Sequence, residues 1–278
     1  MLAERKSIER ISALLAKAER TDNAAEAEAY LMKAQSLATA ASVDLAFARA
    51  QTRRAESRQN PEMRTVTIGE KGKRANRHLV SLFIAIAYAN DAKVDVATNS
   101  TYVMAFGMPG DLDAIEALFT SLAVQMIISA QEWLSLGSWQ GETYLSQAKV
   151  SGRIVQLPKA HTAQTAKVSF FRAFIARIAE RLTLAHDQAV ADALARRGPG
   201  RVTKREGTIV LKQKSDEIRE FHRANSTARG AWGGYSGGVG ADLGTAGKAG
   251  RRAGSRARLA AQRSLPGKTS VEGAGDGR

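Results

Sequence analysis

Residues 102–133, YVMAFGMPGDLDAIEALFTSLAVQMIISAQEW, carry the strongest fold signal in this chain. The stretch opens with β-branched, aromatic and aliphatic residues, which predict a short strand that ends at the glycines and proline of residues 107–110. Asp113 and Glu116 have the spacing of a capping box, so we expect a long helix to begin there. Apolar residues cover more than half of this helix. Neighbouring segments should therefore pack around it on several sides.

The composition indicates a chain that folds around a sizeable core. Of its 278 residues 44% are hydrophobic and only 6% aromatic, a balance that favours helices packed closely through small side chains. Cysteine is absent, which excludes disulfides, thiolate metal sites and cysteine nucleophiles. The longest apolar run, Leu79–Ala89, is shorter than the roughly 20 residues of a membrane span. The start MLAERKSIER is too charged for a signal peptide, so we expect a cytoplasmic protein with no membrane partner.

The net charge points to a polyanionic partner. The formal charge is +14 and the isoelectric point is near 10.3. A surplus of this size favours nucleic acid through Coulomb attraction and the release of condensed counterions. The alternative is that arginines merely cover solvated helix faces, as the Ala/Arg/Gly bias of a GC-rich genome would produce. The clustering of the charge favours the first interpretation.

The first fifty residues predict a small helical hairpin module. Apolar residues at helical spacing predict one helix over residues 8–18, and Asn23 with Glu26 forms a capping box for a second, which runs to about Ala40. A third helix is expected to restart at Ser42. A DNA-reading helix-turn-helix is disfavoured, because glutamates at the start of the second helix would repel phosphate. A packing or partner-binding module fits better.

This module resembles a known family. The pattern ISALLAKAERTDNAAEAEAYLMKAQSLATAASVDLAFA is similar to the N-terminal module of a bacterial and phage family known only as a domain of unknown function (number twenty-seven eighty-six). RHLVSLFIAIAYANDAKV, FGMPGDLDAIEALFTSLAVQM, SFFRAFIARIAERL and GGYSGGVGADLGT resemble the companion domain that follows it in actinobacterial and actinophage proteins. The resemblance implies a phage or mobile-element setting. It implies no activity and no catalytic residue.

The middle of the chain predicts a linker, a small sheet and long helices. Residues 51–77 are strongly basic, and are either a solvated tether or a strap that tracks phosphates. A helix from Leu79 should pack on the central helix, and the strands Lys93–Ala97 and Tyr102–Phe106 should form a hairpin. Residues 134–165 are expected to be a long irregular loop, whose Trp139 and Tyr144 either stack bases or tuck onto the core.

The last third predicts one more long helix and then a tail. Ser169 is expected to cap a helix that ends near Arg197, followed by a strand over Thr208–Leu211 and a short helix over residues 215–223. Residues 225–278 are rich in glycine and arginine, which predicts a disordered basic tail that binds nucleic acid with little sequence specificity. The predicted contact residues lie in the linker and the tail: Arg53, Arg54, Arg58, Lys71, Lys73, Arg74, Lys248, Arg251, Arg252, Arg256, Arg258 and Arg263.

The sequence contains no recognisable catalytic motif. Its four histidines (His78, His161, His186 and His222) are scattered and lack metal-ligand spacing. No Walker loop, GxSxG elbow or GxGxxG after a strand is present. Carboxylate pairs such as Asp111 and Asp113 are explained by a structural turn and helix capping. We therefore expect no cofactor, no bound metal and no catalytic residue.

Together these patterns predict an α+β, predominantly helical protein. We expect a helical module over residues 1–50, a basic linker over 51–77, a central domain with a small sheet packed by long helices over 78–224, and a flexible tail over 225–278. The expected role is a non-enzymatic phage or mobile-element accessory protein that contacts nucleic acid through the linker and the tail. We expect the nucleic acid to be DNA, and a further phage or host protein is the second expected partner. The alternative is a protein-interaction or assembly factor with incidental charge. A metal-dependent hydrolase or nuclease is the third candidate.

Overall fold

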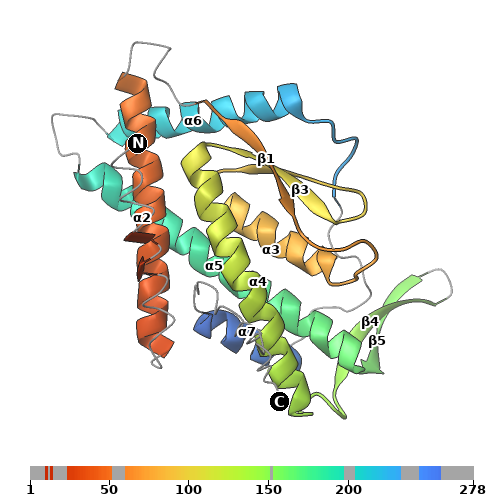
Figure 1. Ribbon diagram of the computed structural model, residues 1–278. Coiled ribbons are helices and arrows are strands. Elements are labelled where there is room, and N and C mark those ends of the chain that lie inside the picture. The colour runs from red at the N-terminus through yellow and green to blue at the C-terminus, as the bar shows by residue number, and fades with distance from the viewer. Residues whose placement is uncertain are drawn as a thin grey trace, which may run out of the picture.

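The protein has the predicted α+β, mainly helical architecture. A computed structural model describes residues 10–11, 13–14, 24–51, 60–150, 153–196, 204–232 and 244–257. Long helices form the body, and a small sheet covers one end of it (Figure 1). The helices are α2 (Ala24–Gln51), α3 (Asn76–Tyr88), α4 (Pro109–Ser135), α5 (Ala163–Arg196), α6 (Lys204–Asn225) and α7 (Thr245–Arg256).

The small sheet is antiparallel, with the strand order β1-β3-β2. Strands β2 (Lys93–Val96) and β3 (Tyr102–Gly107) form the predicted hairpin. Strand β1 (Glu62–Thr67) pairs with the other edge of β3, with Val66 opposite Val103. The prediction that residues 51–77 are only a linker is therefore wrong for this part. The many cations of residues 51–77 drew attention away from the Thr-Val-Thr-Ile pattern of residues 65–68. In this pattern every second residue faces inward, as in a strand.

Helix α4 is the central element, as predicted, but it begins earlier than the capping box suggested. Met108 is extended and Pro109 takes the first helical position, where a missing N–H costs nothing. Asp113 therefore lies inside the helix, and its carboxylate pairs with Arg64 of β1 at 2.5 Å. Further along α4, Leu122 and other apolar residues are fully buried.

By length and composition, α4 is apolar enough to cross a membrane. A core helix of a folded protein meets the same criterion. Here the buried side of α4 packs on α3, α5 and α7, and its Phe119 ring lies edge-on to Phe83 of α3 at 5.2 Å. The apolar character of α4 is thus explained by the core that it forms.

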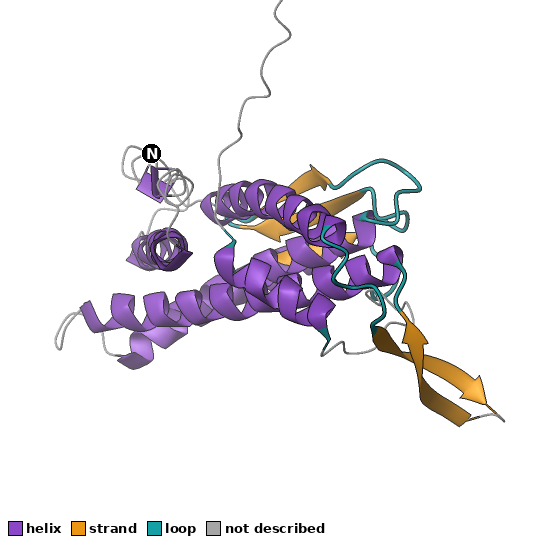
Figure 2. Ribbon diagram, turned by 90° about the horizontal axis from the view of Figure 1, so that it is seen from below, coloured by secondary structure: helices purple, strands orange, loops and turns teal. Residues whose placement is uncertain are grey.

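Residues 143–150 and 153–160 form a β-hairpin, where an irregular loop was expected. Strands β4 (Thr143–Val150) and β5 (Arg153–Ala160) pair antiparallel along their whole length. The hairpin projects away from the helical body (Figure 2). The prediction of a loop was wrong because neither strand shows a clean alternation of apolar and polar residues, a pattern that arises when one face is buried.

The two helices after the hairpin also differ from the prediction. Helix α5 begins at Ala163, where Thr162 and Thr165 exchange side-chain-to-backbone hydrogen bonds at its start, and Ser169 is buried within it rather than capping it. Helix α6 includes Thr208–Leu211, which was expected to be a strand. Its β-branched residues are weak helix formers, but tertiary contacts outweigh that preference. Val210 and Leu211 pack beside Val43 of α2.

Part of the expected disordered tail is a helix docked on α5. Helix α7 places Gly250 and Gly254 directly against the α5 backbone. A Cβ atom on Gly250 would lie 2.2 Å from the carbonyl oxygen of Phe170, so only glycine allows this approach. Gly250 and Gly254, which contributed to the prediction of a flexible tail, are thus part of a close-packing surface. Residues 258–278 lie outside the described part of the chain.

Helix α2 is continuous, although a break was expected near Ser42. It runs from Ala24 to Gln51 and packs along α5 and α6, with Ala34, Val43 and Ala46 buried. Of the preceding helix, residues 10, 11, 13 and 14 are described and are helical. The capping residue Asn23 lies outside the described residues.

Candidate functional site

Helix α7 presents a cationic outer face. The packing against α5 takes Ala246, Gly247, Gly250 and Gly254, which are buried. The intervening residues Lys248, Arg251, Arg252 and Arg256 are exposed. The helix contains no Asp or Glu, so one side is almost free of side chains and the other carries only positive charge and small residues. Four predicted contact residues are thereby brought onto one ordered surface.

One of these four cations is already paired. Arg251 binds Glu180 of α5 with both terminal nitrogens, at 3.0 and 2.9 Å. The hydrogen bond from Arg251 lowers the pKa of Glu180, and Arg177 adds to this effect. Lys248, Arg252 and Arg256 form no ion pair with any other described residue. These three charges are therefore available to an external anion.

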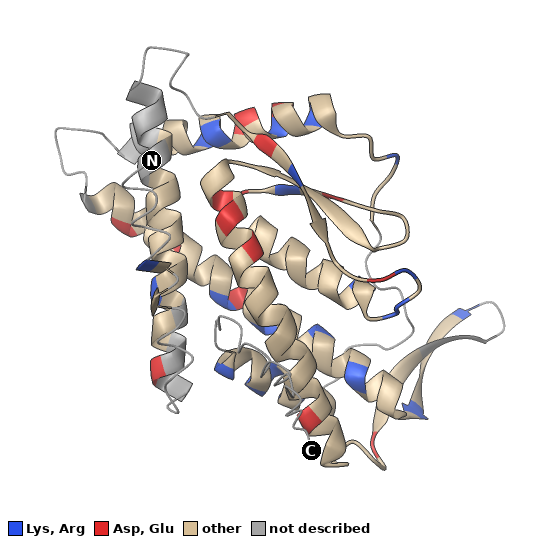
Figure 3. Cartoon of the chain, in the orientation of Figure 1, with Lys and Arg blue, Asp and Glu red and all other residues tan. Residues whose placement is uncertain are grey.

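The start of α7 is tied to the root of the β4–β5 hairpin. The backbone N–H of Thr245 donates to Glu142 Oε2 at 3.0 Å, and its hydroxyl donates to the carbonyl oxygen of Ser138 at 3.3 Å. The hairpin sequence contains Lys149, Arg153 and Lys159 and no acidic residue. In Figure 3, Lys and Arg positions (blue) lie along α7, on the part of α5 next to the hairpin and on the hairpin itself. Asp and Glu positions (red) gather at the start of α4.

Three of the other predicted contact residues are not on this face. Lys71, Lys73 and Arg74 are exposed in the turn between β1 and α3, where Lys73 lies 3.6 Å from Glu70. Among the described residues, no hydrogen bond or ion pair joins Lys71, Lys73 or Arg74 to α7. Arg53, Arg54, Arg58, Arg258 and Arg263 lie outside the described residues.

The aromatic residues suggested for base stacking lie against the body. Trp139 donates its indole N–H to the carbonyl oxygen of Leu134 at 3.1 Å. The ring of Tyr144 lies 5.0 Å from that of His161, at the root of the hairpin. Of the two interpretations left open by the sequence, the structure favours packing.

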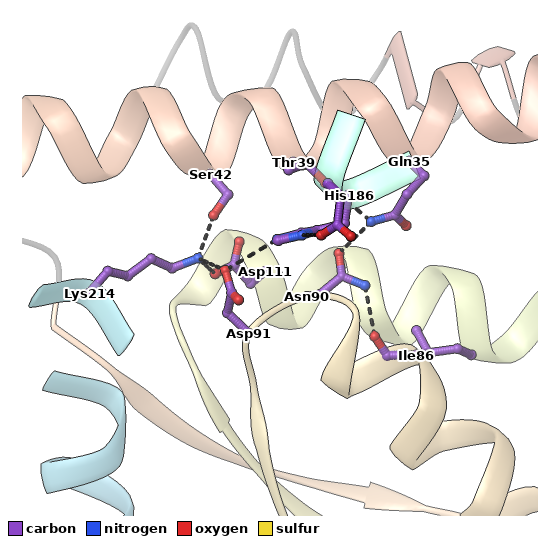
Figure 4. A network of polar contacts seen from close by, with 10 residues as sticks. Gln35, Thr39, Ser42, Ile86, Asn90, Asp91, Asp111, His186 and Lys214 are labelled. Carbon is purple, nitrogen blue, oxygen red and sulfur yellow. Dashed lines mark hydrogen bonds and ion pairs between the residues drawn. The ribbon is translucent and has the colours of Figure 1, made fainter. Parts of the chain in front are cut away.

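A second notable site is a buried ion-pair cluster that the sequence did not predict (Figure 4). Lys214 of α6 is 5% exposed. Its ammonium lies 2.8 Å from Asp111 at the start of α4 and 3.1 Å from Asp91 after α3, and it donates to the Ser42 hydroxyl of α2 at 2.6 Å. His186 of α5 lies 3.6 Å from the same Asp91 oxygen. Five segments far apart in the sequence thus meet in one cluster.

The charges in this cluster are held by one another. Burial opposes ionisation of Lys214, but Asp111 and Asp91 outweigh it and raise its pKa. Burial likewise opposes ionisation of Asp91, yet His186 and Lys214 bring its pKa well below the usual range. The neighbouring carboxylate of Asp91 raises the pKa of His186. Lys214 is therefore a protonated ion-pair partner and not a free amine nucleophile.

The cluster continues into a polar contact between α2 and the end of α3. Gln35 donates to Asn90 at 3.1 Å and to Thr39 at 3.3 Å, while Asn90 donates to the carbonyl oxygen of Ile86 at 2.8 Å. Among the residues that the structure describes, no three His, Asp or Glu side chains converge in a way that could hold a metal ion. The arrangement can fix α2, α4 and α6 relative to one another. It offers no activated nucleophile.

A Ser-His-Asp grouping near the sheet is also structural. Asp95 of β2 bonds His222 through one oxygen at 2.8 Å and Ser226 through the other at 2.6 Å. In a hydrolytic triad the histidine lies between the acid and the serine so that it can take the serine proton. Here the carboxylate is in the middle. This group ties the end of α6 to the sheet.

The buried cluster leaves only a faint signal in the sequence. Asp91 has a φ of 59° and occupies the position after α3 where glycine is usual. Backbone bonds from Asp91 to Tyr88 and from Ala92 to Ala87 close this helix end. An Asn-Asp pair at a helix end, in place of glycine, is the signal in the sequence that the aspartate side chain takes part in a further interaction. Its partner Lys214 lies far away in sequence, on a helix that was expected to be partly a strand.

Comparison with known proteins finds a family match for the amino-terminal segment. No curated protein and no solved structure matches the chain. Residues 6–45 match the family described as Protein of unknown function (DUF2786). This range includes Gln35, Thr39 and Ser42, which join α2 to the rest of the molecule. The amino-terminal segment, residues 6–45 of this chain, is thus similar to the DUF2786 family.

Proposed function

We propose that this protein is a non-enzymatic accessory factor that contacts nucleic acid through the outer face of α7. The observation that carries the proposal is the helix itself, whose inner face is buried and whose outer face exposes Lys248, Arg252 and Arg256 without ion-pair partners among the described residues. Because the backbone of this helix is already ordered, only the side chains of these cations lose freedom when they meet phosphates. The binding is charge-driven and weakly sequence-specific. The phage or mobile-element setting rests on the resemblance of the sequence.

The turn of Lys71, Lys73 and Arg74 is a second contact in this proposal. This turn precedes α3 and lies away from α7 (Figure 3). A polyanion that contacts both would therefore be bound over a longer stretch. The overall charge of +14 supports long-range attraction to the same partner.

The test is a titration of labelled DNA and RNA at two salt concentrations. In the variant Lys248→Gln/Arg252→Gln/Arg256→Gln, each lost phosphate contact should weaken binding roughly eightfold at 0.1 M salt and flatten the salt dependence of log K by about 0.9. The matched control removes the same charge from exposed positions on β2 and α6, as Lys93→Gln/Lys212→Gln/Arg223→Gln. Equal losses of affinity in both variants would show that binding depends only on net charge, and would overturn the α7 assignment.

A further inference from the structure

The β4–β5 hairpin lacks the packing that normally supports a two-stranded ribbon. Nearly all of β5 is exposed, and Ile154, Leu145 and Leu157 are 73%, 43% and 44% exposed. An isolated two-stranded hairpin is marginally stable in water. Apolar side chains on a projecting ribbon are typical of a surface that a partner covers.

The root of the hairpin is nevertheless firmly held. Ser146 is buried, the ring of Tyr144 packs on that of His161, and the backbone N–H of His161 donates to the carbonyl oxygen of Glu142 at 2.8 Å. Glu142 in turn accepts from Thr245 at the start of α7. The direction of the ribbon is therefore fixed relative to the cationic helix, while its outer part stands free of the body (Figure 2).

The charge of this ribbon, the β4–β5 hairpin, indicates which class of partner it binds. Three cations and no carboxylate lie in its two strands, and Arg153 and Lys159 are exposed. Its polar uncharged residues include the exposed Gln156, a side chain that can read base edges. A partner protein recognised by this ribbon would have to be acidic, whereas a nucleic acid offers phosphates and base edges together.

We infer that the β4–β5 hairpin enters the major groove of duplex DNA while α7 contacts the flanking phosphates. The major groove of B-form DNA is about 12 Å wide and admits a two-stranded ribbon. Strands of this length extend roughly 26 Å, enough to pass through the groove. The major groove of an RNA duplex is too narrow and deep for side chains to read. This inference rests on the proposed function and adds the ligand class and the mode of binding.

The experiment compares hairpin and α7 variants of the full chain on two probes of matching sequence, a duplex DNA and a duplex RNA. Arg153→Gln/Lys159→Gln should weaken duplex DNA binding by roughly 60-fold at 0.1 M salt, which is two contacts at about eightfold each. Binding to duplex RNA should stay within about twofold, because the ribbon does not enter that groove. Lys93→Gln/Lys212→Gln is the control of equal charge.

Groove entry has a direct readout in dimethyl sulfate methylation of guanine N7, which faces the major groove. Wild-type protein should protect N7 atoms within the bound site, and the hairpin variant should lose that protection at saturating concentration. Urea unfolding of both proteins tests whether the variant is folded, and Gln156→Ala tests the ribbon without a change of charge.

The outcomes separate this inference from the proposed function. If wild-type protein binds no nucleic acid, both fail. If the α7 variant loses binding while hairpin variants and N7 protection are unchanged, α7 contact stands and groove entry is overturned. Equal losses on DNA and RNA duplexes also overturn it. Sedimentation in which the hairpin variants alone dissociate a dimer would identify a second copy of the chain as the partner and overturn it too.

Discussion

At the scale of single residues, Lys214 of α6 lies at the centre of the buried ion-pair cluster. Its ammonium is buried between Asp91 and Asp111 and also bonds Ser42. Taking these charges out of water is costly, and their mutual attraction offsets that cost only while every partner is present. The cluster therefore specifies one arrangement of the helices more than it adds net stability.

Replacing Lys214 should be strongly destabilising. Lys214→Met leaves two aspartates near a buried site without their cation, and removing one partner of a buried ion pair costs roughly 3–5 kcal/mol. Urea unfolding measures this change. Lys212→Met on the exposed side of the same helix is the control and should change stability by at most about 0.5 kcal/mol. A similarly small effect at position 214 would mean that the cluster is open to water.

A second residue makes stability depend on pH. His78 packs on Phe171, and burial together with the charges of Arg172 and Lys167 lowers its pKa to about 4. The unfolded chain binds this proton near pH 6.5, so protons favour unfolding between about pH 6.5 and 4. His186 acts in the opposite sense: its pKa is raised, so its contribution is present at low pH and is lost as pH rises through the folded value.

The replacement His78→Gln should therefore flatten the acid side of the stability profile. Between pH 7 and pH 4.5, wild-type protein should lose roughly 2–3 kcal/mol more than the variant. Chemical unfolding at both pH values gives the comparison, in which the other titrating groups cancel. Parallel profiles for the two proteins would show that His78 is protonated in the folded state near its ordinary pKa.

At the scale of elements, the contact between α5 and α7 depends on the absence of side chains. Gly250 and Gly254 face the carbonyl oxygens of Phe170 and Phe174, and Arg181 donates to the carbonyl oxygen of Gly254 at 2.5 Å. Arg177 adds a hydrogen bond to Ser255 at 2.9 Å. Glycine, which weakens an isolated helix, thus allows this one to dock.

The replacement Gly250→Ala tests whether docking outweighs helix propensity. In an exposed helix this change stabilises by about 1 kcal/mol. Here the new Cβ would lie 2.2 Å from a backbone oxygen, so we expect net destabilisation by roughly 1–3 kcal/mol. Thermal unfolding gives the sign directly. Arg252→Ala, at an exposed position on α7, serves as the control, and an increase in stability at position 250 would contradict the close packing.

At the scale of the whole molecule, the family-matched helix α2 is part of the body. It buries Ala34, Gln35, Thr39 and Val43, and it reaches α6 through Ser42 and Lys214. The same helix runs beside α4 and α5 in Figure 1. A contact that mixes apolar packing with a buried ion pair should not open independently of the rest.

We therefore expect the protein to unfold in one transition. Scanning calorimetry should give a single peak whose calorimetric and van't Hoff enthalpies agree, as for a cooperative unit. Hydrogen exchange gives the same test locally, because α2 and α5 should share one protection level. Two resolved peaks, the first removed by deleting residues 1–51, would instead make the amino-terminal module an independent domain.

The sequence alone determined the elements whose signals are local. A long apolar helix must be covered, so α4 was placed in the core, and helix α3 and the β2–β3 hairpin followed from apolar spacing and turn residues. The amino-terminal pattern pointed to the DUF2786 family. The cationic residues of α7 were also identified, because charge can be read without knowing the fold.

Only the tertiary structure decided the features that depend on distant partners. Strand β1 exists because β3 offers it an edge, and α7 is ordered because α5 receives its glycines. The Lys214 cluster joins residues more than a hundred positions apart, which no local pattern records. Secondary structure follows short-range periodicity, whereas these contacts follow from the packing of the whole chain, which the sequence encodes only collectively.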